Sequence, residues 1–135
     1  MYLILQQDVA EDFVIATGIT TPVREFVRMA FQEVGIELEF KGANEKEIGV
    51  VVSSSNPDYW IEAGKEVVAV DPRYFRPTEV DLLIGDPTKS NTKLGWKPKY
   101  DLPMLVKEMV ESDLELFRKE KLLQDSGFVI RNQYE

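Results

Sequence analysis

The sequence predicts one small α/β domain, and three observations indicate it. A chain of 135 residues is long enough to bury a single core. Short apolar runs bounded by turn residues, such as 13–16 and 67–70, are typical of strands. Two longer stretches, 21–35 and 101–121, repeat apolar residues at helical spacing. We therefore expect a few short strands and three main helices without an internal domain boundary.

The first residues are predicted to complete one helix and to form one buried strand. Residues 2–7 resemble the last turns of an apolar helix whose beginning is missing. They lack the basic flank and the small-residue cleavage site of a signal peptide. Residues 13–16, Phe-Val-Ile-Ala, form an unbroken apolar run, which is typical of a strand covered on both faces in a parallel sheet.

The next stretch contains the most strongly patterned helix. Thr21 is a preferred N-cap residue, Pro22 suits the first helical position, and Gly35 is a typical residue at a helix end. Residues 36–40 then alternate apolar and acidic side chains, which predicts a half-exposed strand.

The remaining elements follow weaker patterns. Residues 41–66 are predicted to form an irregular β segment on the surface, with a strand at 48–52. A further strand is predicted at 67–70. Residues 82–84 are another short apolar run.

Two more helices are predicted near the end of the chain. Asp86 is expected to cap a helix that Gly95 ends. Asp101 is expected to cap the last helix, whose apolar stripe fades after about Lys121.

Composition excludes several classes of function. Sixteen Lys and Arg against 24 Asp and Glu give a net charge of −8, and such an acidic chain is a poor candidate for binding nucleic acid. His and Cys are absent, which excludes disulfides, the common zinc sites and His-based acid–base catalysis. No apolar run approaches the roughly 20 residues of a membrane span. We expect a soluble, cytoplasmic domain without a metal.

The most informative candidate site is the arginine segment, residues 70–81, Val-Asp-Pro-Arg-Tyr-Phe-Arg-Pro-Thr-Glu-Val-Asp. A guanidinium such as that of Arg76 can hold a diphosphate through paired charge-assisted hydrogen bonds, and the Glu79 carboxylate can accept hydrogen bonds from two sugar hydroxyls. A site for a nucleoside diphosphate sugar needs both groups. The alternative is a surface salt bridge between the two across a turn. Arg73 has a similar alternative, in which it only covers an adjacent aromatic ring.

Three other places are weaker candidates. Arg24 opposes the dipole of its helix, which leaves open a contact with a ligand or partner, although a solvated arginine is the commoner case. Residues 17–21 lie between a predicted strand and a helix, where anions can bind, but they lack the Gly-x-Gly-x-x-Gly spacing. Trp96 can stack on a base or pack a helix end against the core.

Several runs of the sequence resemble the GDP-mannose 4,6-dehydratase family. The arginine segment carries the most specific likeness, to the carboxy-terminal signature of that family. The run Leu-Gly-Trp-Lys-Pro is shared more widely among extended short-chain dehydrogenase/reductase enzymes that act on nucleotide sugars. The resemblance extends from residue 1 to about residue 121. The matching runs are 14–18, 23–26, 71–81, 85–89, 93–98 and 108–115.

The resemblance implies both a fold and a reaction. The fold would be α/β, a small carboxy-terminal nucleotide-sugar-binding domain without its Rossmann domain, with the GDP-sugar-binding region at 1–121 and a tail at 122–135. In this family NADP takes a hydride from sugar C4, water is eliminated across C5 and C6, and the hydride returns to C6. GDP-mannose thereby becomes GDP-4-keto-6-deoxymannose, which leads to GDP-fucose. By resemblance, Arg76 would bind the diphosphate and Glu79 the ribose hydroxyls.

The chain departs from the family pattern where catalysis is concerned. It has no glycine-rich NADP loop, and no Tyr is followed four residues later by Lys. We therefore expect a fragment that is inactive alone, with GDP or GDP-mannose bound here and NADP bound by the missing Rossmann domain. Exposed strand edges and apolar faces favour homo-oligomers. The alternatives are a stand-alone nucleotide-sugar-binding module that works with a separate Rossmann subunit, or a purely structural domain.

Overall fold

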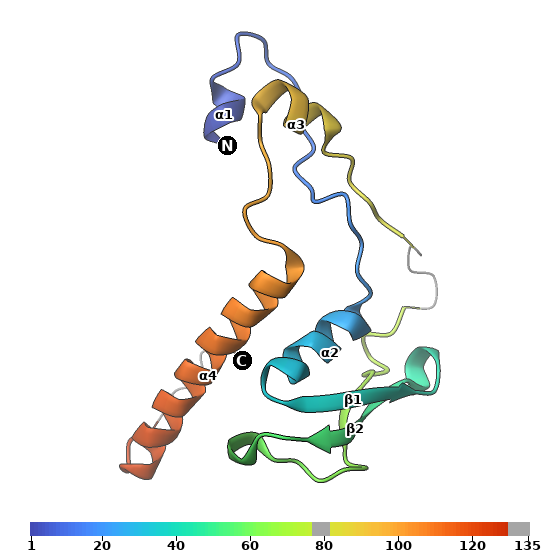
Figure 1. Ribbon diagram of the computed structural model, residues 1–135, viewed down its shortest axis with the longest axis vertical. Helices are drawn as coiled ribbons and strands as arrows, with labels where there is room; N and C mark the ends of the chain where they lie inside the picture. The colour runs from blue at the N-terminus through green and yellow to red at the C-terminus, as the bar shows by residue number, and fades with distance from the viewer. Residues whose placement is uncertain (77–81, 130–135) are drawn as a thin grey trace.

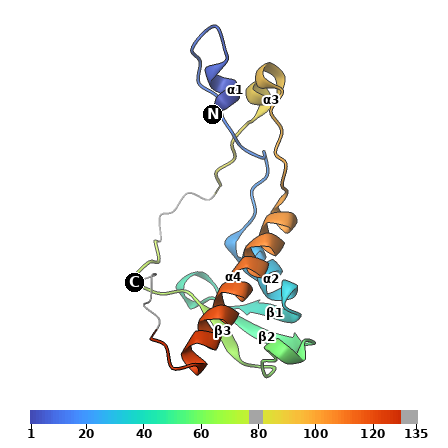
Figure 2. The ribbon, with the colours of Figure 1, turned by 90° about the vertical axis from the view of Figure 1, so that its left-hand side faces the viewer.

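Most of the regular structure lies at one end of an elongated molecule (Figure 1). The computed structural model describes residues 1–76 and 82–129. A three-stranded sheet and the two longest helices form that end, and two short helices lie at the other (Figure 2). The elements in chain order are α1 (Tyr2–Leu5), α2 (Val23–Glu33), β1 (Ile36–Lys41), η1 (Asn44–Lys46), β2 (Ile48–Ser54), η2 (Pro57–Tyr59), β3 (Glu66–Ala69), α3 (Thr88–Leu94) and α4 (Leu102–Asp125).

The sheet is antiparallel, with the strand order β1-β2-β3. Lys41 at the end of β1 pairs with Ile48 at the start of β2, and Ile48 also pairs with Ala69 at the end of β3. The first residues of β1 are alternately buried and exposed. The three strands predicted at 36–40, 48–52 and 67–70 are therefore confirmed, the first of them with the half-exposed pattern expected of it.

The core lies between the sheet and α2. Ile36, Leu38 and Val51 are buried, and Val27 of α2 packs against them. α2 also packs against α4, whose Val106 is only 1% exposed. The same helix therefore joins the sheet on one side to the last helix on the other, as Figure 2 shows.

α2 begins one residue later than predicted. Pro22 is extended, with φ −58° and ψ 143°, and occupies the N-cap position itself. The Thr21 hydroxyl therefore lies one residue too early to bond the N–H groups of the first turn. The end of the helix is as predicted. Gly35 follows it with φ +77°, and a Cβ there would lie 2.8 Å from Ser55 Oγ.

Asp101 caps the last helix as predicted, but α3 begins one residue later than predicted, with Pro87 at its N-cap position. Asp86 Oδ1 accepts a hydrogen bond from the Thr88 N–H at 2.9 Å, just before α3. Asp101 Oδ1 accepts one from the Met104 N–H at 2.9 Å and caps α4. Gly95 ends α3 in the left-handed conformation, with φ +62°.

The last helix is longer than its apolar pattern indicates. The stripe fades after about Lys121, but α4 continues to Asp125. The added residues include two leucines and a glutamine, which are good helix formers. Leu122 is 67% exposed, so intrinsic propensity rather than burial extends the helix here.

The strand predicted over residues 13–16 is wrong for the described part of the chain. These residues join no sheet, and Val14 is 51% exposed. The Val14 carbonyl accepts a hydrogen bond from the Ser90 hydroxyl at 2.7 Å instead of from a neighbouring strand. The strands of a parallel sheet are covered on both faces. The segment 82–87 runs beside it in the opposite direction (Figure 1), with Gly85 close to Val14 and Ala16, but it is not a strand either.

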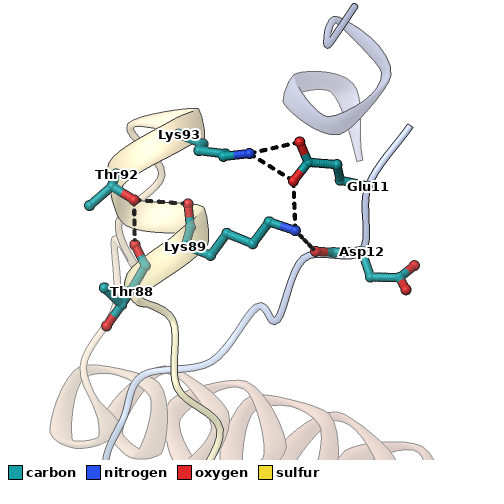
Figure 3. Close-up of polar contacts among 6 residues, drawn as sticks. All are labelled: Glu11, Asp12, Thr88, Lys89, Thr92 and Lys93. Carbon is teal, nitrogen blue, oxygen red and sulfur yellow. Dashed lines mark hydrogen bonds and ion pairs between the residues drawn. The ribbon is translucent and has the colours of Figure 1, made fainter. Parts of the chain in front are cut away.

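A cluster of ion pairs attaches α3 to the N-terminal segment (Figure 3). Lys89 and Lys93 lie one turn apart on α3, and each places its Nζ 2.7 Å from the Glu11 carboxylate. Lys89 also donates to the Asp12 carbonyl at 2.9 Å and lies 4.9 Å from the centre of the Phe13 ring. The hydrogen bonds from Lys89 and then Lys93 lower the pKa of Glu11 to about 2.

Truncation of the core is expected to be far more costly than the same change on the surface. Ile36 is 2% exposed and Ile19 is 77% exposed, which makes them a matched pair. Ile36→Ala should lower the free energy of unfolding by about 2–5 kcal/mol, because it leaves a cavity. Ile19→Ala should change it by less than about 0.5 kcal/mol. Urea denaturation measures both, and equal effects would contradict the placement of the core.

Strong acid is expected to detach α3 from the N-terminal segment. The pKa of Glu11 is lowered from 4.5 to about 2 in the folded chain. A depressed pKa means that the stabilising contribution is complete above the ordinary value and is lost as the pH falls through the lower one. The NMR amide shifts of Lys89 and Lys93 should therefore titrate with a midpoint near 2. Glu11→Gln should abolish this titration, and a midpoint at the ordinary glutamate value would contradict the ion pairs.

Candidate functional site

The arginine segment leaves the sheet at the end of β3 and begins with a tight turn. Val70 follows the strand, and the Tyr74 N–H donates to the Asp71 carbonyl at 3.0 Å. Pro72 occupies the second position of this turn, where its fixed φ is favourable. The first part of the segment therefore has a defined conformation of its own.

Arg73 is held by Asp71 inside that turn. Arg73 Nη2 lies 2.7 Å from Asp71 Oδ2, and its Nε lies 3.1 Å from the same oxygen. These hydrogen bonds lower the pKa of Asp71 and raise the pKa of Arg73. The Arg73 guanidinium also lies over the Tyr74 ring, 5.6 Å from its centre. The interpretation in which Arg73 covers an adjacent aromatic ring is thus confirmed.

The two predicted site residues lie at the edge of the described structure. Arg76 is exposed to solvent, and within residues 1–76 and 82–129 its guanidinium has no ion-pair partner. Glu79 falls in the stretch 77–81, outside the described residues. The pairing of a diphosphate-binding arginine with a ribose-binding glutamate therefore stays a prediction.

Arg24 has a partner that the sequence pattern does not reveal. Its Nη2 lies 2.9 Å from Glu47 Oε1, and the Glu47 side chain is only 18% exposed. The two residues line a cavity of about 280 Å³ together with Val68 and Val70. Arg24 is therefore ion-paired rather than simply solvated. The shared cavity also shows that the arginine segment begins beside the N-terminus of α2.

The sequence-predicted anion site lies in a groove that is mostly apolar. Thr17 and Thr21 line a space of about 580 Å³ together with Tyr100 and the first turn of α4. The Thr17 hydroxyl accepts a hydrogen bond from the Ile19 N–H at 3.3 Å, so it already serves the local turn. No sequence pattern links Tyr100 to this place, because it lies some 80 residues further along the chain. The charged residues of its lining are Lys99 and Asp101, and the Asp101 carboxylate already caps α4.

Trp96 packs at the end of α3. The residue is partly buried, and its backbone N–H donates to the Ser90 carbonyl at 3.3 Å. Ser90 is fully buried, and its hydroxyl donates toward the carbonyls of Val14 and Pro87. The partial burial of Trp96 favours the packing interpretation over stacking on a base.

The described residues do not fit NADP. Dinucleotides bind at the carboxyl ends of parallel strands, where a glycine-rich turn lets the backbone approach the pyrophosphate. The sheet formed by the described residues is antiparallel, and no two glycines in the chain are separated by a single residue.

The described helices also lack the combination of length and apolar character needed to cross a membrane. Within the same residues, no group of three carboxylate, thiol or imidazole side chains is gathered closely enough to hold a metal ion.

Comparisons with known proteins agree on one family. A sequence model described as GDP-mannose 4,6 dehydratase matches residues 1–109. The GDP-mannose 4,6-dehydratase of Yersinia enterocolitica is 48% identical over 129 residues, which cover 94% of this chain and 34% of the relative. The Vibrio cholerae enzyme is 48% identical over 130 residues, with the same coverage. The Homo sapiens enzyme is 48% identical over 118 residues, covering 87% of this chain and 29% of the relative.

This chain therefore spans about a third of the length of the curated relatives that it matches. The family match covers well over half of the chain and includes the whole arginine segment. The chain belongs to the GDP-mannose 4,6-dehydratase family.

Proposed function

We propose that this chain is the carboxy-terminal, GDP-sugar-binding part of a GDP-mannose 4,6-dehydratase. The observation that carries the proposal is the arginine segment, which lies inside the family match and starts from a defined turn after β3. The parent enzyme would convert GDP-mannose to GDP-4-keto-6-deoxymannose in the cytoplasm. This part would supply affinity for the nucleotide and leave the redox chemistry to the rest of the enzyme.

Arg76 is the residue that would hold the diphosphate. Its guanidinium is planar and permanently charged, so it can donate two parallel hydrogen bonds to phosphate oxygens. The side chain is exposed at the end of the described part of the segment, where a ligand can reach it. Glu79, three residues later, would accept hydrogen bonds from the ribose hydroxyls.

The rest of the parent enzyme would cover the exposed apolar residues of the extended segments. Val14, Leu83 and Ile84 are 51%, 76% and 56% exposed in this chain. Apolar patches of this kind mark interaction surfaces. A Rossmann domain carrying NADP would bury them and supply the hydride acceptor and the general base. The chain alone should therefore be inactive.

A stand-alone nucleotide-sugar-binding module is the second candidate. The feature in its favour is the separate core at one end of the molecule, where Ile36, Leu38 and Val51 are buried without any contribution from a Rossmann domain. Such a module would bind a GDP-sugar by itself or work beside a separate Rossmann subunit.

Binding of GDP is expected to depend on Arg76. Arg76→Ala should cost about 1.5–3 kcal/mol of binding free energy, the usual scale for hydrogen bonds to a charged group. Calorimetric titration of the purified chain with GDP and GMP measures the effect. The wild type should prefer GDP, and the variant should lose that preference because the second phosphate loses its partner.

The matched control is Arg118→Ala, which removes a guanidinium from α4 that contacts the Tyr59 hydroxyl. This control should bind GDP as the wild type does. If Arg76→Ala unfolds the chain instead of weakening binding, Arg76 has a purely structural role and the proposal fails.

The isolated chain is expected to self-associate through the same exposed apolar residues. Leu83→Lys should shift the protein toward the monomer in light scattering, because it places a charge in the patch. Leu122→Lys is the control, since Leu122 is 67% exposed but lies on α4 at the other end. A wild-type chain that stays monomeric at high concentration would count against the prediction.

A further inference from the structure

We propose that Asp71 is a positioning residue for Arg76: its side chain fixes the turn from which Arg76 is presented to a diphosphate. The inference rests on the proposed function of the arginine segment. Asp71 need not touch the ligand. It acts through the turn that precedes the phosphate-binding arginine.

The geometry shows how completely one carboxylate determines this turn. Asp71 Oδ1 accepts hydrogen bonds from the backbone N–H of Arg73 at 2.9 Å and from its Nε at 3.2 Å. The backbone carbonyl of Asp71 accepts from the Tyr74 N–H at 3.0 Å. Pro72, between them, adds a fixed φ. The backbone of residues 71–74 is therefore held by the same residue through its side chain and its main chain.

Asp71 also separates the roles of the two arginines. The carboxylate binds the Arg73 guanidinium through two nitrogens, and Arg73 lies over the Tyr74 ring. Arg73 is thereby kept within its own turn, and Phe75 after it is partly buried. Arg76 is the first exposed cation beyond these constraints. A ligand that binds it does not have to order the preceding turn, and pre-organisation of this kind improves affinity.

The chain offers variants that separate the backbone contact from the charge. Asp71→Ala removes both. Asp71→Asn keeps an oxygen that can accept from the Arg73 N–H but removes the negative charge. Arg73→Gln removes the guanidinium and leaves the backbone contact intact. If Asp71 acts by shaping the backbone, only the first variant should impair the presentation of Arg76.

The test is calorimetric titration of the full 135-residue chain with GDP and with GMP. Asp71→Ala should weaken GDP binding by about three- to tenfold, the range expected when a few ordered residues must be fixed on binding. GMP binding should change less, because the second phosphate is the group that Arg76 reaches. Asp71→Asn and Arg73→Gln should remain within about twofold of the wild type for both ligands.

Each other outcome overturns a distinct claim. Wild-type affinity in Asp71→Ala, or equal losses in Asp71→Asn and Asp71→Ala, would exclude positioning through the backbone. Equal losses for GDP and GMP would show a general structural defect, which thermal unfolding of the variant would also reveal. A wild-type chain that binds no GDP, or an Arg76→Ala variant that binds it normally, would refute the proposed function itself, and the role of Asp71 with it.

Discussion

The packing of α2 against β1 is the interaction on which the rest of this structure depends. It buries Ile36 and Leu38 on one side, and the same helix meets α4 on the other. β1 pairs with β2, and β2 pairs with β3. The core between α2 and the sheet therefore also determines the position of β3, the strand that precedes the arginine segment. The position of Arg76 is thus a consequence of burial, followed by a turn that Asp71 determines.

The opposite end of the molecule depends on polar contacts instead. Glu11 pairs with two lysines of α3, and the buried Ser90 hydroxyl bonds the Val14 carbonyl, but apolar residues such as Leu83 stay exposed. Surface ion pairs contribute little to stability. One end is therefore organised by a core of its own, whereas the other presents apolar surface of the kind that a further domain would bury. This division fits a binding part that works together with a catalytic part.

The sequence predicted correctly those helices and strands whose pattern lies within a short run of residues. The stripe of α2, the Asp101 cap and the alternation in β1 are each visible in a short run of residues, and all three predictions are confirmed. Residues 13–16 are apolar enough for a buried strand, but within the described part of the chain they join no sheet. The ion pair between Arg24 and Glu47 could not be predicted from the sequence either, because only the fold brings the two residues together. The roles of Arg76 and Glu79 were assigned from their chemistry and from the family signature, and both stay predictions.

A chimeric enzyme tests the central claim most directly. The stretch of the Yersinia enterocolitica dehydratase that matches this chain, 48% identical to it, would be replaced by the chain and the product assayed for turnover of GDP-mannose. The account predicts that the folded chimera forms the 4-keto sugar, that its Arg76→Ala variant needs much more GDP-mannose to do so, and that the chain alone forms none. A folded but inactive chimera, or turnover by the chain alone, would contradict it.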